Sequence, residues 1–416
     1  MTPNSTRDAT VVIIGAGLAG LACARELHQR RIPFLLLEAS DRLGGRVRTD
    51  AHEGFLLDRG FQVYLTAYPE GRRVFDYAAL RFGAFLPGAL VRFQDRFHRV
   101  MDPWRQPLGA LASLLNPVGS MVDKMRVAGL RAASLAGQPE QLFTKPETSA
   151  RAALLRYGFS EAMIQRFFQP FFGGIMLDRD LKPSSRMLEF VFRMMATGDT
   201  VLPAEGMEAL PRSLAAALPP NSLRCGCPVA SFAAGSVQLS NGETLAARAV
   251  VLATDGPTAH RLHPAIAPVN SRGVNIAYFA VSGPPPITEP IIILNGNPSG
   301  LIQNLSFPSV VSPTYAPAGQ HLAGATVLGG PRENLAEEVR QELRTWFGPT
   351  VDQWRPLRTY HIPHAHPAFE PETATAQPLQ LAPGLFVCGD HRFFPSLQAA
   401  LSTGRQAAEA VAASLA

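Results

Sequence analysis

The fold of this 416-residue chain is decided by residues 11–20, which read Val11-Val12-Ile13-Ile14-Gly15-Ala16-Gly17-Leu18-Ala19-Gly20. The first four residues are β-branched and apolar, the pattern of a strand buried on both faces. A glycine-rich turn follows without a spacer, and residues 21–27 predict a helix rich in small residues. A second apolar run, residues 34–37, ends at Glu38. This order of strand, turn, helix, strand and acid is typical of a dinucleotide-binding βαβ unit.

Each glycine of the turn has its own expected role. Gly15 permits the tight turn, Gly17 leaves room for a diphosphate, and Gly20 lets helix and strand pack closely. The N–H groups at the helix start, with the positive end of the helix dipole, hold phosphates. An acid at position 38 suits an unphosphorylated ribose, as in FAD or NAD, better than NADP. The predicted cofactor contacts in this unit are Gly15, Ala16, Gly17, Leu18, Ala19, Gly20 and Glu38.

Residues 38–62 extend the unit. Paired glycines between arginines, in Arg42-Leu43-Gly44-Gly45-Arg46, indicate a backbone close to a ligand, with guanidinium groups meeting phosphate. Together with the preceding unit, this stretch resembles the fingerprint of the FAD-dependent amine oxidase superfamily, which includes monoamine oxidases, protoporphyrinogen oxidases and carotenoid desaturases. The resemblance implies further cofactor contacts from Ala39, Arg42, Gly44, Gly45, Arg46, Gly60, Phe61 and Gln62.

The C-terminal end carries a second signal. Residues 384–390 predict a buried strand that ends in Gly389-Asp390, and Pro395 and Ser396 suit the start of a helix that runs to the C-terminus. In the superfamily this aspartate binds the ribityl chain, and the helix start faces the flavin ring, where its dipole would stabilise a reduced, anionic flavin by about 1 kcal/mol. The resemblance therefore implies non-covalent FAD, contacted by Gly389, Asp390, Leu397, Gln398 and Ala399.

The middle of the chain returns once to the dinucleotide unit. Residues 228–232 and 236–239, with an Asn241-Gly242 turn, predict short paired strands. Residues 249–254 predict another buried strand. By resemblance, Val229 matches the position whose backbone holds the adenine, and Ala253 lies in a Val-Leu-Ala-Thr stretch that the superfamily shares.

The predicted fold class is α/β, with a discontinuous Rossmann-type FAD-binding domain, a mixed-sheet substrate domain and a helical subdomain. We assign residues 1–75, 200–270 and 375–416 to the FAD-binding domain. Residues 76–199 are expected to form a helical substrate or lid subdomain, because apolar clusters alternate with arginine and lysine over 104–137. Residues 271–374 are expected to form an antiparallel-sheet substrate domain, with strands over 273–281, 291–294, 300–303 and 321–327.

The expected chemistry also follows from the resemblance. Monoamine and polyamine oxidases place a lysine on a substrate-domain strand, where it holds water at flavin N5. Asn275 stands near that place, and the lysines of this chain are Lys124, Lys145 and Lys182. The resemblance is therefore nearer the desaturase and protoporphyrinogen oxidase branches. It implies dehydrogenation of a bulky hydrophobic substrate, of polyene or tetrapyrrole type, by hydride transfer to N5.

In this interpretation the flavin carries the reaction, and Asn275 and Tyr360 are the candidate substrate-side residues. An electron acceptor, oxygen or a quinone, is also required. Two alternatives stay open. One is a flavin amine oxidase that produces peroxide, and the other is a non-catalytic flavin-containing protein that binds isoprenoids. The sequence does not predict the oligomeric state.

Composition excludes several other classes. The charge of +5 is carried almost wholly by dispersed arginines, so we expect no nucleic-acid arm and at most a peripheral membrane contact through residues 104–137. The four cysteines are too scattered for a disulfide framework or a zinc site, and the histidines near residue 364 lack ligand spacing, so no metal is expected. Without a recognisable signal peptide or a long apolar run, the expected location is the cytoplasm.

Overall fold

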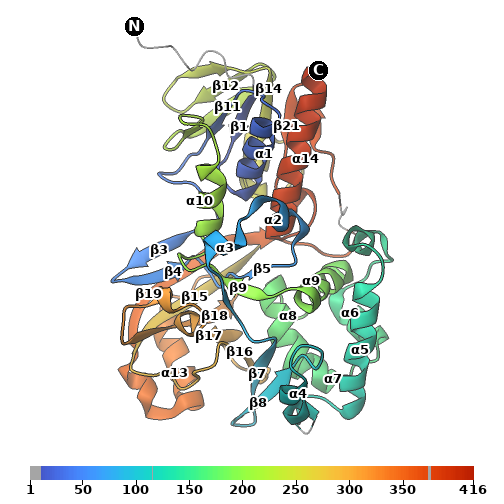
Figure 1. Cartoon of the computed structure of the whole chain (residues 1–416), viewed down its shortest axis with the longest axis vertical. Helices are drawn as coiled ribbons and strands as arrows, with labels where there is room; N and C mark the ends of the chain where they lie inside the picture. Colours follow the sequence, from blue (N-terminus) through green and yellow to red (C-terminus); the bar gives the residue numbers. More distant parts are fainter. Residues whose placement is uncertain (1–10, 115, 373–375) are drawn as a thin grey trace.

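The computed structural model describes residues 11–114, 116–372 and 376–416, and it is an α/β structure with a dinucleotide-type sheet at one end (Figure 1). This sheet has the strand order β10-β2-β1-β14-β21-β20, and all neighbours are parallel except β20. Its strands are β1 (Val11–Ile14), β2 (Phe34–Leu37), β10 (Leu223–Arg224), β14 (Ala249–Leu252), β20 (Gln380–Ala382) and β21 (Leu385–Val387). The central strands are buried throughout, as their continuous apolar runs predict.

Two helices from opposite ends of the sequence pack side by side on this sheet (Figure 1). They are α1 (Leu18–Gln29) and α14 (Leu397–Leu415). Their contact is close because it uses small residues: a Cβ on Gly404 would lie 2.2 Å from the carbonyl oxygen of Ala19. The other face carries α11 (Gly256–Leu262) and a small sheet of β11 (Val229–Ala233), β12 (Ser236–Leu239) and β13 (Thr244–Ala246).

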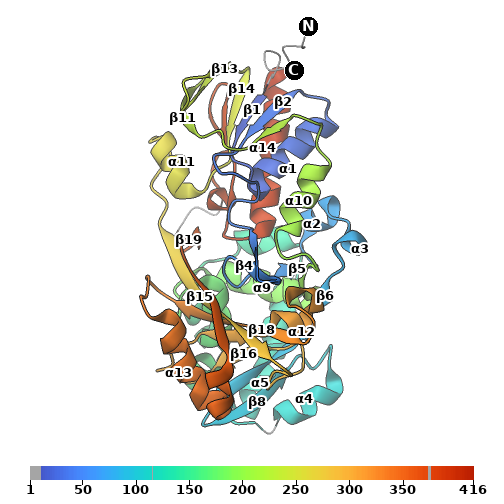
Figure 2. The ribbon, with the colours of Figure 1, turned by 90° about the vertical axis from the view of Figure 1, so that its left-hand side faces the viewer.

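A seven-stranded mixed sheet fills much of the other half of the molecule, in the order β19-β15-β18-β17-β16-β7-β8. Figure 2 shows its long strand β15 crossing that half beside β18. The strands are β7 (Gly88–Phe93), β8 (Arg96–Met101), β15 (Ser271–Ser282), β16 (Ile292–Asn295), β17 (Asn304–Ser306), β18 (Gln320–Leu328) and β19 (Arg355–Pro367). Helix α13 (Leu335–Phe347) packs on one face through Val339 and Leu343.

Two expectations for this half were wrong. Residues 88–101, expected to be part of a helical segment, form the hairpin β7–β8, and β7 pairs with β16 in parallel. The strand expected over residues 300–303 lies at Asn304–Ser306 instead. The hairpin was missed because its turn is Gln94-Asp95, in which both residues have positive φ, and not the Asn-Gly or Asp-Gly pair that marks such turns.

Helices cover the opposite side of this sheet. They are α4 (Pro107–Leu114), α5 (Met121–Leu135), α6 (Ala150–Arg156), α7 (Glu161–Met163), α8 (Gln169–Met176) and α9 (Ser185–Thr197), with a π-helical turn η2 (Ile164–Phe168) before α8. Helix α9 buries its apolar side chains Met187, Leu188, Val191 and Met194, which recur three or four residues apart. Its N-terminus is capped by Ser184, whose side chain accepts a hydrogen bond from the Arg186 amide.

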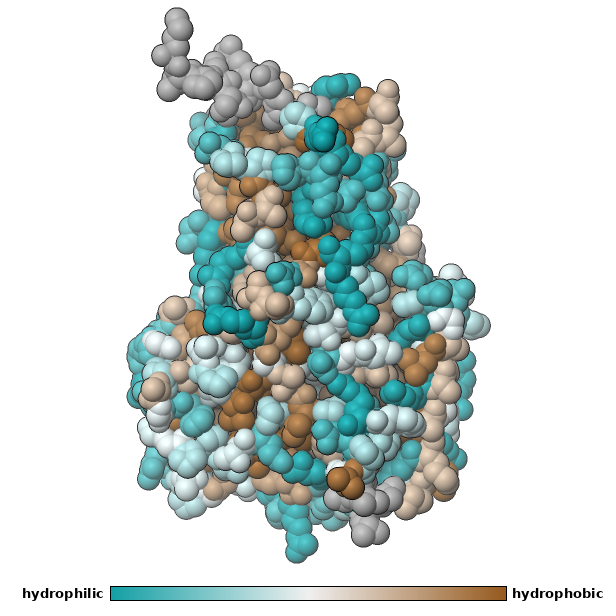
Figure 3. Space-filling view, viewed as in Figure 1, coloured by the Kyte–Doolittle hydropathy of each residue, from teal (hydrophilic) through white to brown (hydrophobic). Residues whose placement is uncertain are grey.

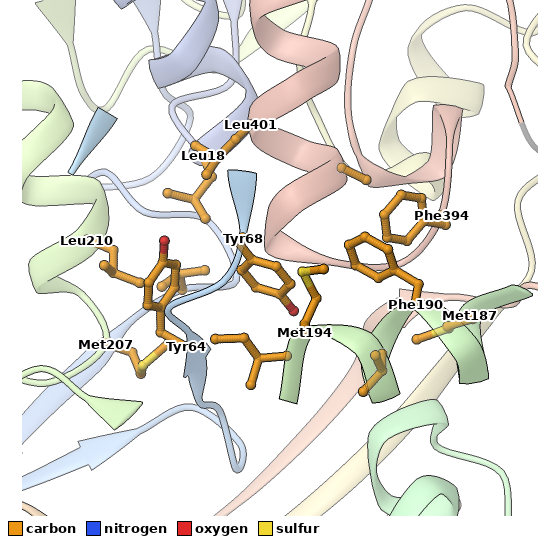
Figure 4. Close-up of a cluster of buried hydrophobic side chains, with 14 of the residues drawn as sticks. Leu18, Tyr64, Tyr68, Met187, Phe190, Met194, Met207, Leu210, Phe394 and Leu401 are labelled. Carbon is orange, nitrogen blue, oxygen red and sulfur yellow. The ribbon is translucent and has the colours of Figure 1, made fainter. Parts of the chain in front are cut away.

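Short elements join the two halves. They are β3 (Thr49–His52), β4 (Phe55–Asp58), β5 (Tyr64–Leu65), α2 (Pro69–Val74), α3 (Tyr77–Leu80), β6 (Gly83–Ala84), β9 (Thr200–Leu202), α10 (Ala209–Ala216) and α12 (Pro308–Val311). The junction is a continuous hydrophobic core, where Leu18 and Leu401 of the dinucleotide half approach Tyr68 and, beyond it, Phe190 of α9 (Figure 4). Each such fully buried side chain contributes about 1.5–3 kcal/mol, so the halves are held together firmly.

A buried carboxyl also ties the junction together. Asp58 accepts hydrogen bonds from the Tyr315 hydroxyl at 2.8 Å and from the Met207 amide at 3.0 Å. The hydroxyl of Tyr278 in β15 donates to the Asp58 carbonyl at 2.9 Å. Burial raises the pKa of Asp58 to about 6, against the smaller opposing effect of these hydrogen bonds.

This raised pKa predicts a pH-dependent stability. From about pH 4 to pH 6 the unfolded chain loses the Asp58 proton while the folded chain keeps it, so stability falls as pH rises. Relative to Asp58→Asn, the native chain should lose about 2.5 kcal/mol of unfolding free energy between about pH 4 and pH 7. Urea unfolding of both proteins at the two pH values measures this difference. A difference that does not change with pH would contradict the assignment.

On the face drawn in Figure 3, hydrophobic residues are interspersed with polar ones. Among the described residues, the large apolar side chains that are exposed lie mostly between residues 104 and 125: Trp104, Leu108, Met121, Val122 and Met125, with Leu155 elsewhere. In the described part of the chain, no helix has both the length and the apolar character needed to cross a membrane.

Candidate functional site

The site begins where four parallel strands end. Gly15 follows β1, Glu38 follows β2, Ala253 follows β14, and Gly389 lies two residues after β21. These four residues line one cavity at the carboxyl edge of the dinucleotide-type sheet. This edge is where open α/β sheets bind their ligands.

The glycine turn has the geometry that a diphosphate requires. Gly15 has φ +110°, and a Cβ there would lie 2.9 Å from the Ala253 carbonyl oxygen, so a side chain is excluded. A Cβ on Gly20 would lie 1.9 Å from the Gly15 carbonyl oxygen, so this glycine allows the helix to pack on the turn. Gly17 differs, because a Cβ there would have no atom within 4 Å. Its side-chain direction is open space at the N-terminus of α1, which suits an anion.

Glu38 is fixed beneath this turn. Its Oε2 accepts the Ala16 amide at 2.8 Å, and its Oε1 accepts the Ser40 amide at 3.0 Å and the Ser40 hydroxyl at 2.7 Å. These bonds hold the carboxylate at the cavity wall. Carboxylate oxygens have further acceptor capacity, which a ribose hydroxyl can use.

The paired glycines bring a second segment against the turn. The Gly44 amide donates to the Ala16 carbonyl at 2.9 Å, and a Cβ on Gly45, whose φ is +59°, would lie 3.3 Å from the Gly17 Cα. The next residue, Arg46, lies against the Gly389-Asp390 turn near the C-terminus. The Arg46 guanidinium donates to Asp390 at 2.6 Å and to the Ala365 carbonyl at 3.0 Å. Burial disfavours the ionised Asp390, but the Arg46 charge outweighs it and holds the Asp390 pKa below its usual value.

The cavity is large and continuous. Its volume is about 1090 Å³, more than the roughly 300–1000 Å³ of a typical single-ligand pocket. It runs from Val229 and Glu38, past Arg46, to a chamber between the mixed sheet and the helices. This size gives room for a dinucleotide and a second molecule.

Two buried acceptors beside Arg46 have no hydrogen-bond donor from the described residues. They are Oε1 of Gln62 and Nε2 of His366, and both residues line the cavity. Burial lowers the pKa of His366, and its Nδ1 lies 2.8 Å from the Pro367 carbonyl, so Nδ1 carries the proton and Nε2 is an acceptor. Acceptors without donors fit a ligand rich in hydroxyl and N–H groups, as the ribityl chain and ring of FAD are.

The start of α14 closes this part of the cavity. Ser396 caps the helix, since its Oγ accepts the Ala399 amide at 2.9 Å, and Leu397 and Ala400 face the cavity. The Gln398 side chain points elsewhere: its Oε1 accepts the Glu70 amide at 2.9 Å. The positive end of a 19-residue helix therefore meets the ligand space.

Most of the predicted cofactor contacts line the cavity, and their contact with FAD stays a prediction. They are Gly15, Gly17, Leu18, Ala19, Glu38, Ala39, Gly44, Gly45, Arg46, Gly60, Phe61, Gln62, Val229, Ala253, Gly389, Asp390 and Leu397. The predicted residues outside the lining are Ala16, Gly20, Arg42, Gln398 and Ala399. Arg42 is turned away from the cavity to pair with Asp50, and the cavity-lining His366 was not among the predicted residues.

The two candidate substrate-side residues do not face the cavity. Asn275 lies on the opposite face of β15, where its Nδ2 donates to the carbonyls of Gly329 at 3.1 Å and Gly330 at 2.9 Å. The Tyr360 hydroxyl donates to Asp50 at 2.9 Å. The residue of β15 that lines the cavity is Val274, next to Asn275. For Asn275 the expectation was wrong by one residue, because successive strand residues point to opposite faces.

This correction predicts separate effects for neighbouring residues. Asn275→Ala removes the donor to two loop carbonyls, so it should cost about 1–3 kcal/mol of unfolding free energy and leave substrate KM unchanged. Val274→Ala, on the cavity face, should raise KM. Urea unfolding and steady-state kinetics of both variants measure this. A raised KM for Asn275→Ala at full FAD loading would contradict the assigned faces.

The chamber beyond the cofactor segments is mostly apolar. One wall is the mixed sheet, with Val274, Ile292, Leu294 and Ile362, and the other is helical, with Phe167, Phe171, Ile175, Met187 and Met195. The carboxylates that line the cavity are Glu38, Asp102, Asp255 and Asp390 among the described residues. Three of them follow strands of the dinucleotide-type sheet, and Asp102 pairs with Arg131 at 3.7 Å beside Trp104.

Metal chemistry receives no support from the geometry. Within the described ranges, the structure brings together no group of three or more histidine, cysteine, aspartate or glutamate side chains that could hold a metal ion.

A known protein family matches most of this chain. The family of flavin-containing amine oxidoreductases matches residues 18–412. The chain belongs to this family of FAD-dependent oxidoreductases, and FAD is its cofactor. The resemblance expected from the sequence is thereby confirmed.

Individual relatives differ in what their names say they act on. The chain is 47% identical over 64 residues to the human lysine-specific histone demethylase 2, which covers 15% of this chain and 8% of that protein. It is 26% identical over 171 residues to coproporphyrinogen III oxidase of Propionibacterium freudenreichii subsp. freudenreichii, covering 40% of this chain and 31% of that protein. These matches span less than a third of either relative.

A solved structure shares nearly the whole fold. The putative protoporphyrinogen oxidase from Exiguobacterium sp. 255-15 superposes with a TM-score of 0.71 at 19% identity, covering 98% of this chain and 99% of that one. At this identity the likeness establishes the α/β fold.

Proposed function

We propose that this protein dehydrogenates a bulky, mainly hydrophobic substrate of polyene or tetrapyrrole type, with FAD as the hydride acceptor at N5. The observation that carries the proposal is the apolar chamber, whose two walls are aliphatic strand residues and aromatic or methionine side chains of the helices. Burying such a substrate against these walls is favourable at about 25 cal/mol per Å² of apolar surface.

The protein's own contribution is binding, orientation and exclusion of water. Bound FAD supplies the hydride acceptor, so no nucleophile or paired carboxylate is needed in the chamber. Val274 and Ile362 lie against the backbone at Gly60, where a Cβ would be 3.8 Å and 3.6 Å from their methyl groups, so the sheet wall adjoins the cofactor segment directly. A flat substrate in the chamber would be pressed towards that segment by the facing helices.

The chamber is poorly suited to a cationic amine. A buried ammonium group needs a carboxylate or another strong partner, and the described residues of the two apolar walls include no carboxylate. The sequence match to a lysine-specific histone demethylase nevertheless makes amine oxidation the second candidate function.

Anaerobic mixing of the FAD-loaded protein with candidate substrates tests the proposal. We expect a porphyrinogen or an acyclic polyene to abolish the visible absorbance of oxidised flavin, and simple amines to leave it unchanged. Turnover should then continue with oxygen or a quinone as electron acceptor. Loss of absorbance with amines alone would favour the amine oxidase. Stoichiometric polyene binding without any flavin reduction would favour the non-catalytic isoprenoid-binding protein.

We further propose that the rim of the cavity makes a peripheral membrane contact. Trp104, Met121 and Met125 line this rim and are 48%, 49% and 63% exposed. Arg105 and Arg131 line the cavity beside them, paired with Asp199 and Asp102, and a cluster of exposed aromatic and aliphatic side chains suits a bilayer surface. The native protein should float with anionic liposomes, and Met125→Ser with Trp104→Ser should reduce this. Equal flotation of both proteins would contradict the contact.

A further inference from the structure

Two polar side chains interrupt the apolar wall of the chamber. Asn304 of β17 and Thr326 of β18 are 4% and 2% exposed, and both line the cavity. They are direct neighbours across the two antiparallel strands. Their cavity-lining neighbours on the same sheet are Val274, Ile292, Leu294 and Ile362, all of them aliphatic.

Both side chains lack hydrogen-bond partners for buried atoms. Oδ1 of Asn304 and Oγ1 of Thr326 are fully buried, and no described residue bonds to either. Buried polar groups in proteins are normally paired, so two adjacent unpaired groups in residues that line a cavity point to a ligand partner. An apolar residue of the same shape at either position would have avoided the free-energy cost of burying an unpaired polar atom.

The facing helix packs closely over this pair. Helix α8 packs against β16 and β17 (Figure 1), and Gly174 on it lies opposite Asn304. A Cβ on Gly174 would lie 2.8 Å from Asn304 Nδ2, so any side chain there would press on the amide. The preceding turn η2 is π-helical, a form that often marks functional sites.

We infer that Asn304 and Thr326 form a recognition pair for a neutral N–H or O–H group carried inside the apolar body of the substrate. Asn304 Oδ1 accepts from that group, and the Thr326 hydroxyl can accept or donate. This inference rests on the proposed function and narrows it. A pyrrole N–H or the hydroxyl of a hydroxylated polyene satisfies the pair, and a hydrocarbon polyene leaves both atoms unpaired.

The test uses two near-isosteric variants, Asn304→Leu and Thr326→Val, and a matched control, Ser306→Ala. Ser306 is also fully buried, lies on the same strand and has an unpartnered Oγ, but it does not line the cavity. The probes are coproporphyrinogen III, whose pyrrole N–H groups can turn outward, a hydroxylated carotene and β-carotene. All are added without oxygen to protein whose flavin is already reduced. Their affinity for the FAD-loaded proteins is measured by quenching of tryptophan fluorescence.

Each cavity variant should weaken binding of the porphyrinogen, or of the hydroxylated carotene, by about tenfold and leave β-carotene binding unchanged. Weaker binding of the pyrrole-bearing probe would identify an N–H group as the partner of the pair. Weaker binding of the hydroxylated carotene would identify an O–H group. The control should bind all three probes as the native protein does. Unfolding midpoints of the cavity variants should be equal or higher, because an unpaired polar group has been replaced by an apolar one.

Several results would overturn the inference. They are unchanged affinity for both donor-bearing probes, an equal loss for β-carotene, and a lowered unfolding midpoint, which would reveal a structural partner. Native protein that binds β-carotene tightly and neither donor-bearing probe would also overturn it, while the proposed function would stand. If no porphyrinogen or polyene reduces the flavin, it is the proposed function that fails.

Discussion

Gly17→Asp is expected to lower the affinity for FAD by at least about 100-fold, equivalent to roughly 2.7 kcal/mol. The new carboxylate would occupy the open space above the α1 N-terminus and would compete with the diphosphate for the same N–H groups. Negative charge on the side chain would also repel the ligand. We expect protein purified and mixed with FAD to remain colourless after gel filtration.

The fold should survive this change. Gly17 is the N-cap residue of α1, with φ −75°, a conformation open to any residue, and aspartate is among the preferred N-cap residues. A Cβ at this position meets no atom within 4 Å. The unfolding free energy of the Gly17→Asp apoprotein should therefore equal that of the native apoprotein or be slightly higher.

Gly129→Asp provides a matched control for the Gly17 variant. Gly129 lies on the exposed side of α5, and a Cβ there also meets no atom within 4 Å. This variant should bind FAD as the native chain does. FAD titration followed by flavin fluorescence compares all three proteins, and native-like affinity in Gly17→Asp would place the diphosphate elsewhere.

Arg46→Ala should cost about 3 kcal/mol of unfolding free energy in the apoprotein, because it leaves the buried Asp390 carboxylate without its charged partner. We use the lower end of the range for broken buried pairs, since 32% of the Arg46 side chain is exposed. The loss should be smaller in the double variant Arg46→Ala/Asp390→Ala, where neither charge remains.

An exposed pair in the same protein gives the comparison for Arg46. Arg332 and Glu338 pair at 2.6 Å, with side chains 41% and 39% exposed. Arg332→Ala should cost less than about 1 kcal/mol. Urea unfolding at neutral pH measures every variant. If Arg46→Ala costs no more than Arg332→Ala, the pair does not join the two ends of the chain as described.

The cofactor half of the site could be predicted from sequence because its signals are local. The apolar run before Gly15 and the helix after it are contiguous, and β1, β2 and the Gly389-Asp390 turn lie where the pattern predicts them. The fold class is confirmed. Positions such as Gly15 and Gly20 are fixed by backbone contacts that no other residue fits.

The substrate half could be predicted less well because its determinants are non-local. Strand β15 is buried on both faces from Val274 to Val281, so no alternation of polar and apolar residues fixes which side chains face the cavity. This is why Asn275 was placed on the wrong face. Asn304 and Thr326 are neighbours only through strand pairing, and nothing in the local sequence of either residue connects the two.

Titration of the apoprotein with FAD and with FMN tests the central claim most directly. Because the cavity runs continuously from Val229 and Glu38 to the start of α14, the site should hold a whole dinucleotide. We predict one FAD per chain and at least about 100-fold weaker binding of FMN, which lacks the adenosine part. Equal affinity for the two, or no FAD bound after reconstitution, would contradict the claim that both ends of the chain hold one FAD molecule.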